Sequence, residues 1–366
     1  MTARERARAV IRMVRRGQLA ALRASGQLLH GRGANDRADR HELRILVHVP
    51  GYPPGQLGGA EQSIAAIVAA FRDRGHEVQV LVGGDTEVVP EHGPDARSGL
   101  SWRATWELYR WCDVVFTQLE TRNLAMRRAA LAARPVVHFL RMGGADQRSA
   151  IGVPELVVFN ANWVRDAAHW PGVSLVLHPP VVADEYRTEP GASVTLVNAS
   201  RPKGAPLFYE LARRFPDRSF LAVRGTWGEQ LEPSPLPNLT LAGPVSDMRE
   251  VYSRTRIVLM PSSAESYGRV GLEAGASGIP TIASDLPGVR EALGDSALYA
   301  APDDVDAWVK QLRALDDAQK YAQHAAAARA RADAATAQSI EELDRLEARV
   351  TELAACVRGR AKRAVK

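Results

Sequence analysis

Short apolar runs alternate with helical segments along most of this chain, and this alternation predicts its fold. Residues 43–49 form an apolar run typical of a buried strand, residues 60–74 have helical spacing, and residues 77–82 form the next run. Later runs of the same kind lie at residues 113–117, 135–140, 156–160, 194–198, 220–223, 239–242, 256–260 and 281–284. Strands that alternate with helices predict an α/β protein with doubly wound, Rossmann-like parallel sheets.

The length of the chain and its proline-rich breaks divide it into parts. At 366 residues it is too long for one core and suits two domains. The segment that starts at His178-Pro-Pro180 and ends at Pro190-Gly191 reads as a hinge. The predicted parts are a basic extension (residues 1–40), a first domain (41–183), a second domain (184–338) and a C-terminal segment (339–366) with an amphipathic helix over about 340–357.

One stretch in the second domain carries more chemistry than the rest of the chain. The apolar run 256–260 leads into a Pro-Ser-Ser turn, then Glu265, then a helix of small residues from about Gly268 to Ala276. Gly278-Ile-Pro280 ends that helix before the next strand. A strand, glycine turn and helix direct free backbone N–H groups and the positive end of the helix dipole at an anion. The pattern therefore predicts a phosphate site.

Two carboxylates flank this predicted phosphate site. Glu265 lies on the turn and Glu273 lies inside the helix, about 12 Å further along at most. Carboxylates repel a bare phosphate, but they accept hydrogen bonds from the hydroxyl groups of sugars. A nucleotide sugar has a hexose on one side of its diphosphate and a ribose on the other, which suits this spacing. The alternative is that both glutamates are solvated residues at a helix end.

The segment Pro261–Pro280 resembles the E-x7-E signature of retaining GT-B glycosyltransferases of family 4, with Tyr267 in place of the commoner phenylalanine. With weaker motifs, the resemblance covers about residues 43–350. It implies that Glu265 holds hydroxyls of the donor sugar, that Glu273 holds the ribose hydroxyls, and that the donor is a UDP- or GDP-sugar. The donor-binding residues that it implies in this segment are Glu265, Ser266, Tyr267, Gly268, Arg269, Val270 and Glu273.

The same resemblance implies further contacts in the second domain. Lys203 and Gly204 match a family motif in which the lysine binds the donor diphosphate. The family's usual arginine falls on Ala199 or Ser200 here, and Arg201 is the candidate replacement. A solvated loop lysine is the alternative for Lys203. Loops that surround the base in the family correspond to segments that contain Arg224, Gly243 and Val245.

In the first domain the candidate residues lie after two strands. Gly58 and Gly59 stand at a helix start, where glycine lets a backbone approach a ligand closely, and the family's N-terminal loop at this place faces the donor phosphates and the acceptor. His138 is expected at the carboxyl end of its strand, and the resemblance implies a contact near the anomeric centre. A structural histidine is the alternative. The fold implied is GT-B, with two domains that face a cleft and a last helix that crosses back to the first domain.

Charge is concentrated at the two ends of the chain. Residues 1–40 have ten arginines and three acidic residues, residues 355–366 have five basic residues and no acidic one, and residues 41–354 have a net charge of −7. An acidic body argues against nucleic-acid binding. Arg4, Arg8, Arg12 and Arg16 form a stripe suited to an anionic membrane surface. A solvated extension and an over-long start assignment remain open alternatives.

Other sequence features exclude several classes of site. Asp304 and Asp306 resemble the Asp-x-Asp of metal-dependent transferases, but their context predicts helix capping, so we expect no metal and no cofactor. Cys112 and Cys356 lack metal-type spacing. The sequence has no run of 18 apolar residues and no apolar signal-peptide core, so we expect a cytoplasmic protein, peripheral on the membrane if the basic ends bind lipid.

These features predict one function and leave two alternatives open. The predicted function is a metal-independent, retaining glycosyltransferase with His138, Lys203 and Glu265 in catalytic roles. Its acceptor is a lipid-linked glycan, a small molecule or a protein. The alternatives are a sugar-nucleotide epimerase with the same fold and a catalytically weakened protein that binds nucleotide sugars.

Overall fold

The computed structural model describes residues 42–83, 93–142, 152–226 and 228–364, with side chains up to residue 356. The chain forms two compact units. The first unit comprises the chain up to Gln56, Glu61–Leu177 and the chain from Glu342, and the second comprises Leu57–Ala60 and His178–Glu341. The basic N-terminal extension expected from the sequence lies outside the described residues.

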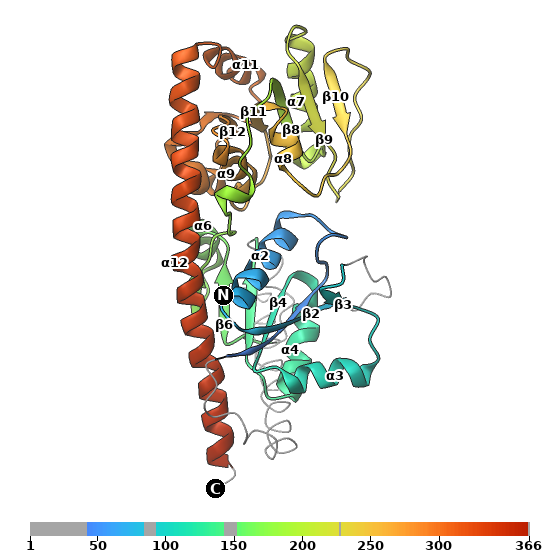
Figure 1. The fold of residues 1–366 in the computed structure, drawn as a ribbon, viewed down its shortest axis with the longest axis vertical. Helices are drawn as coiled ribbons and strands as arrows, with labels where there is room; N and C mark the ends of the chain where they lie inside the picture. The colour runs from blue at the N-terminus through green and yellow to red at the C-terminus, as the bar shows by residue number, and fades with distance from the viewer. Residues whose placement is uncertain (1–41, 84–92, 143–151, 227, 365–366) are drawn as a thin grey trace, which may run out of the picture. The chain divides into compact units, whose positions relative to one another are not determined.

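The first unit is built on a parallel sheet (Figure 1). Among the described residues it has seven strands in the order β3-β2-β1-β4-β5-β6-β7. The strands are β1 (Arg44–Val49), β2 (Glu77–Val82), β3 (Ala96–Arg97), β4 (Val114–Gln118), β5 (Val136–Leu140), β6 (Leu156–Phe159) and β7 (Ser174–Val176). The helices are α2 (Gly59–Asp73), α3 (Trp102–Trp111), η1 (Leu119–Thr121), α4 (Arg122–Leu131) and α6 (Asn162–Ala168).

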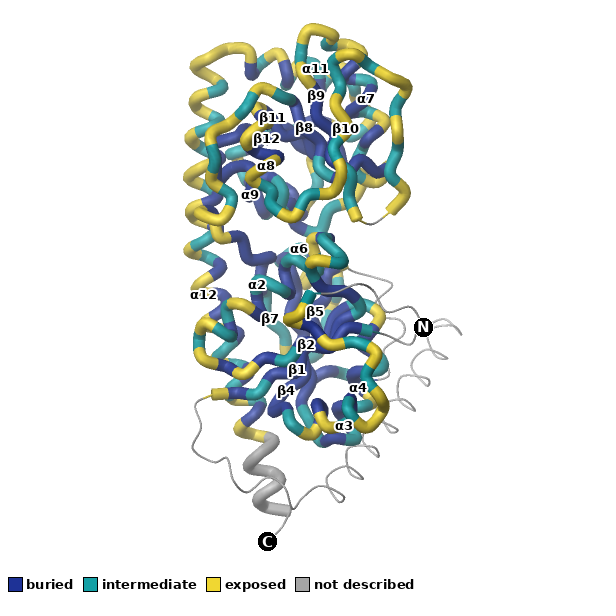
Figure 2. The backbone as a smooth tube through the Cα atoms, turned by 45° about the vertical axis from the view of Figure 1, so that its right-hand side comes forward, coloured by how far each residue is buried: buried dark blue, intermediate teal, exposed yellow. Residues whose placement is uncertain are grey.

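The strands of this sheet are apolar because helices cover both faces. Every residue of β4, β5 and β6 is buried, as parallel strands between two helical layers require (Figure 2). On one side Phe71 of α2 packs edge-to-face on Phe116, which packs in turn on Phe139. The core of this unit is therefore continuous from α2 across β4 to β5.

The second unit has a parallel sheet with a similar plan. In the described part of the chain it has six strands in the order β10-β9-β8-β11-β12-β13. The strands are β8 (Ser193–Val197), β9 (Phe220–Val223), β10 (Leu239–Ala242), β11 (Thr255–Met260), β12 (Thr281–Ser284) and β13 (Leu298–Ala300). The helical elements are η2 (Ala183–Glu185), η3 (Arg201–Lys203), α7 (Ala205–Arg214), α8 (Arg249–Tyr252), α9 (Arg269–Ala276), α10 (Pro287–Leu293), η4 (Gly294–Ser296) and α11 (Val305–Ala314). The predicted fold class, two doubly wound parallel sheets, is confirmed.

The last helix is longer than the sequence predicted. We expected a helix over about residues 340–357, whereas α12 runs without a break over Ala318–Ala364. Its Ala328, Ala332 and Ala335 are buried in the second unit, and its Leu343, Leu346 and Val350 enter the core of the first. The first part of α12 is rich in alanine and has no strong apolar stripe in its sequence. Its small side chains let it pack closely on α9, since a Cβ at Gly275 of α9 would lie 2.8 Å from the Ala328 carbonyl oxygen.

The described helices include none that is both long enough and apolar enough to cross a bilayer.

Candidate functional site

The strand order of the second unit fixes where a ligand site is expected. The chain goes outward from β8 through β9 to β10, then returns to the other side of β8 to form β11, β12 and β13. In open parallel sheets a crevice forms at the carboxyl ends of the strands where the order reverses. The loops that follow β8 and β11, over residues 198–204 and 261–268, therefore meet at the switch point of this sheet.

Backbone contacts hold these two loops against each other. The Ser263 N–H donates to the Pro202 carbonyl oxygen at 2.9 Å. Gly204 has φ +82°, and a Cβ there would lie 2.1 Å from the Pro261 carbonyl oxygen. Only glycine fits this position, because any side chain would overlap the neighbouring loop and disfavour the backbone conformation. Gly204 therefore serves the contact between the loops.

Lys203 and Glu265 form an ion pair across this junction. The Lys203 Nζ lies 2.5 Å from Glu265 Oε1, and the Ser262 hydroxyl donates to the same oxygen at 2.9 Å. The lysine side chain is 22% exposed and the glutamate side chain 14% exposed, so solvent reaches both groups. The structure thus brings together two of the three residues predicted to be catalytic, each held by the other.

The turn after Glu265 is shaped by a contact that the sequence did not predict. Gly288 of α10 packs on the turn so closely that a Cβ would lie 2.5 Å from the Ser266 carbonyl oxygen and 2.7 Å from that of Glu265. Gly268 has φ +118° and precedes the first residue of α9. The Leu-Pro-Gly signal at residues 286–288 predicts a helix start, but a sequence alone does not show which loop that start supports.

Glu273 lies deeper than a solvated helix residue. Only 6% of it is exposed, and both carboxylate oxygens have partners. Arg269 Nε donates to Oε1 at 2.5 Å, and the Tyr252 hydroxyl donates to Oε2 at 2.8 Å. Arg269 Nη2 also donates to the Tyr186 hydroxyl at 2.7 Å. Ser266, Tyr267 and Val270 lie on the same loop and first helical turn, with Tyr267 buried against the ring of His178.

The loop after β9 is held by an amide network. Asn198 has φ +66°, and its side-chain oxygen accepts from Gln230 Nε2 at 2.9 Å. The Gln230 side-chain oxygen accepts from the Gly225 N–H at 2.8 Å. A Cβ at Gly225 would lie 2.5 Å from the Asn198 side chain, so a larger residue here would displace that side chain. These contacts join the loop that contains Arg224 to the end of β8.

The remaining predicted residues of this unit lie nearer the surface. Arg224 pairs with Glu232, and both side chains are largely exposed. Gly243 is exposed with open space where a Cβ would stand, and Val245 is half-buried. Arg201 is exposed at the first position of η3 and makes no ion pair with any residue that the structure describes. The Arg201 side chain can therefore bind a ligand two residues before Lys203. Ala199 and Ser200, where the family's arginine would fall, are fully buried.

In the first unit, His138 differs from its expected position. We predicted it at the carboxyl end of its strand, but β5 continues to Leu140 and His138 is the third of its five residues. Its side chain is fully buried. Two more buried strand residues, Phe139 and Leu140, follow His138 before β5 ends. The predicted Gly58 and Gly59 group with the second unit. Gly58 is buried, whereas Gly59, the first residue of α2, is exposed, and an added Cβ there would meet no atom within 4 Å.

The carboxyl edge of the first sheet holds polar groups that the sequence patterns did not single out. His48 is buried at the end of β1, with ring nitrogens 2.7 Å from the Tyr109 hydroxyl and 3.1 Å from the Gly83 carbonyl oxygen. Burial, assisted by the positive charge of Arg128, lowers the pKa of His48 to about 3, so the ring is neutral. Arg141, directly after β5, donates twice to Gln118 Oε1 at the end of β4.

Glu61, in the first turn of α2, adds a carboxylate to this region. Burial raises the pKa of its side chain, and the positive charge of Arg141 opposes that shift. The sequence signals were present, since Glu61 follows Gly58-Gly59 and Arg141 directly follows a strand. Neither position belongs to a motif that distinguishes a site from an ordinary helix start or strand end.

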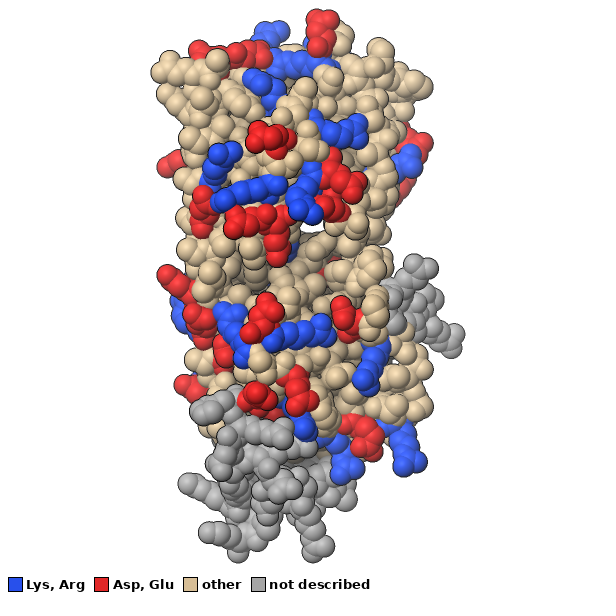
Figure 3. Space-filling model, viewed as in Figure 1, with Lys and Arg blue, Asp and Glu red and all other residues tan. Residues whose placement is uncertain are grey.

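The Asp-x-Asp sequence acts as a helix start. The Asp304 side chain accepts from the Ala307 N–H at 3.0 Å and caps α11, while Asp306 pairs with Arg214 of α7. No group of three or more histidine, cysteine, aspartate or glutamate side chains in the described residues is arranged to hold a metal ion. Basic and acidic side chains are interspersed on the face drawn in Figure 3.

Comparisons with known proteins agree with this geometry. Residues 200–317, which contain most of the first switch-point loop and all of the second, match the family described as "Glycosyl transferases group 1". Over 76 residues the chain is 37% identical to the O-antigen chain mannosyltransferase RfbU of Salmonella typhimurium, which is 20% of this chain and 22% of that one. Over 158 residues it is 32% identical to the D-inositol 3-phosphate glycosyltransferase of Mycobacteroides abscessus, which is 38% and 35% of the two chains. The matches thus span about a fifth to a third of these relatives.

Solved structures resemble the fold of most of the chain. HepE of Anabaena, solved with UDP and glucose, has a TM-score of 0.67 at 19% identity, covering 83% of this chain and all of that one. Sucrose-phosphate synthase of Thermosynechococcus elongatus has a TM-score of 0.65 at 16% identity, covering 84% of this chain and all of that one. At such identities the likeness concerns the fold. The chain has the GT-B fold, and its residues 200–317 carry the sequence pattern of the group 1 glycosyl transferases.

Proposed function

We propose that this protein is a retaining glycosyltransferase, which moves a sugar from a nucleotide diphosphate sugar to an acceptor hydroxyl without a metal ion. The observation that carries the proposal is the Lys203–Glu265 ion pair at the switch point of the second sheet, directly before the start of α9. A cation beside a helix N-terminus suits a diphosphate, and a carboxylate beside both suits a sugar hydroxyl.

Each group in the second unit has a task in this proposal. The N–H groups at the start of α9 and the ammonium group of Lys203 bind the diphosphate, and Arg201 supplies a second cation. Glu265 accepts hydrogen bonds from hydroxyls of the transferred sugar, while Glu273 accepts those of the ribose. Because Glu265 is already held by Lys203 and Ser262, its carboxylate is preorganised before the donor binds.

The transfer step uses charge stabilisation by the same groups. As the bond from the anomeric carbon to the phosphate oxygen breaks, negative charge develops on the departing diphosphate. Lys203 and the N-terminus of α9 stabilise that charge. The leaving phosphate oxygen takes the proton of the acceptor hydroxyl, which attacks from the same face, so the anomeric configuration is retained. His138 is proposed to support the reaction centre from the first unit.

The donor is proposed to be a UDP- or GDP-sugar. HepE, one of the structural neighbours, was solved with UDP-glucose, which makes this compound the first donor to test. The relatives act on an O-antigen chain and on an inositol phosphate, so hydroxyl-rich glycans and anionic polyols are suitable first acceptors. We also propose that the protein works in the cytoplasm and that the basic ends attach it to anionic membranes.

Nucleotide release tests the proposal. The full-length protein is incubated with UDP-glucose, other UDP-sugars and GDP-sugars, with and without an acceptor panel. A transferase releases nucleoside diphosphate in proportion to acceptor, and NMR of the product reports the anomeric configuration. Release without any acceptor indicates an epimerase or hydrolase instead. Tight donor binding with no release under any condition indicates a binding protein, and either outcome would overturn the proposed activity.

A further inference from the structure

A buried cluster of four side chains surrounds the carboxylate assigned to the ribose. Arg269 and Glu273 come from the same helix, α9, one turn apart, while Tyr252 ends α8 and Tyr186 follows η2. The Arg269 and Glu273 side chains are 11% and 8% exposed. The rings of Tyr186 and Tyr252 meet edge-to-face with centroids 6.5 Å apart. The cluster therefore encloses the ion pair in aromatic surface.

The hydrogen bonds of this cluster leave specific capacity unused. A carboxylate has about four acceptor positions, and Glu273 receives one hydrogen bond on each oxygen, from Arg269 and from Tyr252. Two acceptor positions remain, and their directions are set because both oxygens are already held. A separate donor on each oxygen restrains the carboxylate from rotating about its terminal bond.

Arg269 itself is held by a residue from outside the helix. Its Nη2 donates to the Tyr186 hydroxyl, whereas Nη1 is buried and has no hydrogen-bond partner among the described residues. A buried donor without a partner is unfavourable for stability. Burial, together with the charge of Glu273, raises the pKa of Tyr186 to about 12. The phenol is therefore neutral and supplies a lone pair to the arginine.

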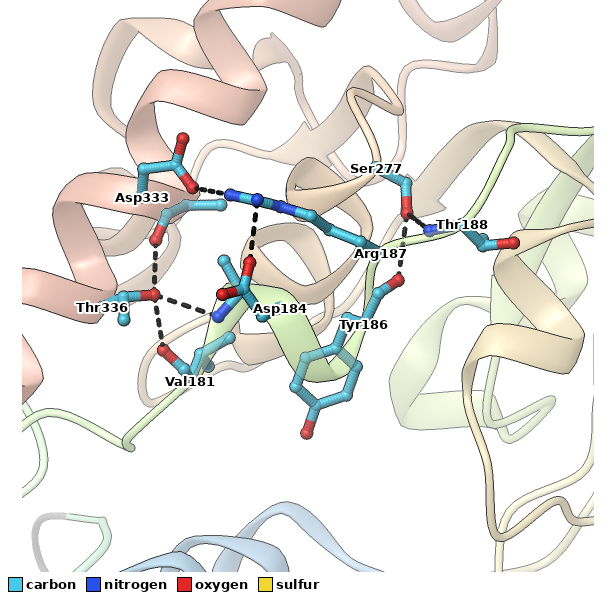
Figure 4. A network of polar contacts seen from close by, with 10 residues as sticks. Val181, Asp184, Tyr186, Arg187, Thr188, Ser277, Asp333 and Thr336 are labelled. Atoms are coloured by element: carbon cyan, nitrogen blue, oxygen red, sulfur yellow. Dashed lines mark hydrogen bonds and ion pairs between the residues drawn. The ribbon is translucent and has the colours of Figure 1, made fainter.

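The segment that contains Tyr186 is itself fixed to its own unit by a side-chain network (Figure 4). The Thr336 hydroxyl donates to the Val181 carbonyl oxygen, and Arg187 pairs with Asp184 and with Asp333 of α12. Ser277, at the end of α9, donates its hydroxyl hydrogen to the Tyr186 carbonyl oxygen at 3.0 Å. The Tyr186 ring is thus placed by contacts with α9 and α12, although its segment has no strand partner among the described residues.

We propose that Tyr186 and Arg269 are positioning residues, which fix the Glu273 carboxylate in the one orientation that accepts both ribose hydroxyls of the nucleotide. The inference rests on the proposed function, in which Glu273 faces the ribose. It assigns a binding role to an arginine of the motif and to a tyrosine about 80 residues earlier in the chain. Neither side chain contacts the ligand in this proposal; each acts through Glu273.

Paired nucleotides with and without a ribose hydroxyl test this role. Affinities of UDP and 2′-deoxy-UDP, or of GDP and 2′-deoxy-GDP if wild type prefers guanine, are measured by calorimetry on the full-length protein. We expect wild type to prefer the ribonucleotide by about tenfold or more, since the lost hydrogen bond goes to a charged acceptor. Tyr186→Phe removes only the hydroxyl and should reduce that preference by about threefold.

Two further variants and a control keep the result interpretable. Arg269→Lys retains the charge and should keep part of the preference, whereas Arg269→Leu should abolish it if the protein folds. Tyr299→Phe is the matched control, because Tyr299 is also a half-buried tyrosine of the second unit with a raised pKa, and its hydroxyl donates to the Gly294 carbonyl oxygen. The control should bind both nucleotides as wild type does.

The outcomes separate this inference from the proposed function. If wild type binds neither UDP nor GDP, the nucleotide-sugar function itself fails. If wild type prefers the ribonucleotide and Tyr186→Phe keeps the full preference, the positioning role is wrong while the function stands. An equal loss of affinity for ribo- and deoxynucleotide in Tyr186→Phe indicates a structural role only, and this also overturns the inference.

Discussion

The two sheets end in chemically different edges although their architecture is similar. At the switch point of the second sheet the polar groups are ion pairs, Lys203 with Glu265 and Arg269 with Glu273. At the edge of the first sheet His48 is neutral and bonded to Tyr109, and Arg141 donates to the amide of Gln118. The second edge therefore presents two ion pairs, whereas the first presents a neutral imidazole, a guanidinium bonded to an amide, and the carboxylate of Glu61.

This difference bears on the donor site that we propose in the second unit. A diphosphate needs cations and free N–H groups, which the second edge supplies. Before a ligand binds, each of these charged side chains is compensated by its partner in an ion pair. The neutral groups at the first edge, His48 and Tyr109, are by contrast buried and bonded to each other.

The largest expected effect comes from removing the charge of Glu265. Glu265→Gln should lower kcat about 100-fold or more, because a preorganised charged contact is lost at the reacting sugar. The affinity for bare UDP should change little, since the contact is to the transferred sugar. Steady-state kinetics with UDP-glucose and calorimetry with UDP measure the two quantities. Glu210→Gln, on α7, is the control, and an equally active Glu265→Gln would refute the catalytic assignment.

Glu273→Gln should act on binding rather than on turnover. A hydrogen bond to a charged acceptor contributes about 1.5–3 kcal/mol, so the affinity for bare nucleoside diphosphate should fall by about 10- to 100-fold. Calorimetry measures this loss, and a thermal-unfolding check excludes misfolding, because the variant leaves Arg269 buried without its counter-charge. Unchanged affinity for UDP and GDP would remove the ribose assignment.

The contrast between the edges was only partly predictable from the sequence. The alternation of apolar runs predicted both sheets, and the glycine turn with two spaced glutamates predicted the loop after β11, because these patterns are local. The pairing of Lys203 with Glu265 could not be predicted, since it joins loops about 60 residues apart. The same holds for Gly288 and Tyr186, which support the site from other elements.

Two expectations failed for identifiable reasons. The sequence placed His138 at the end of its strand, but hydrophobic residues on both sides keep it within β5. The helix expected over residues 340–357 begins at Ala318, because alanine packing against α9 leaves little apolar periodicity to detect. Both errors concern features whose basis is tertiary packing rather than local pattern.

The neutral state of His48 can be tested by lowering the pH. The pKa of His48 is about 3 in the folded protein and about 6.5 when unfolded, so the unfolded state binds the extra proton between these values. The stability that His48 supports is complete above pH 6.5 and declines as pH falls, by about 2 kcal/mol at pH 5. Hydrogen exchange can measure the first unit by itself. His48→Gln should weaken this dependence, and an unchanged profile would contradict the neutral buried histidine.

The smallest effects are expected where the second unit carries acidic residues away from the switch point. Activity should survive excess EDTA, because the proposal assigns charge stabilisation to Lys203 and to the start of α9. Asp304→Ala should destabilise the protein by about 1 kcal/mol through loss of the α11 cap, with kcat unchanged. Asp306→Ala should alter neither rate nor stability appreciably, since its side chain is 86% exposed and its partner Arg214 lies on the surface. Loss of activity with EDTA that manganese or magnesium restores would show that a metal, rather than the lysine, carries the leaving group's charge.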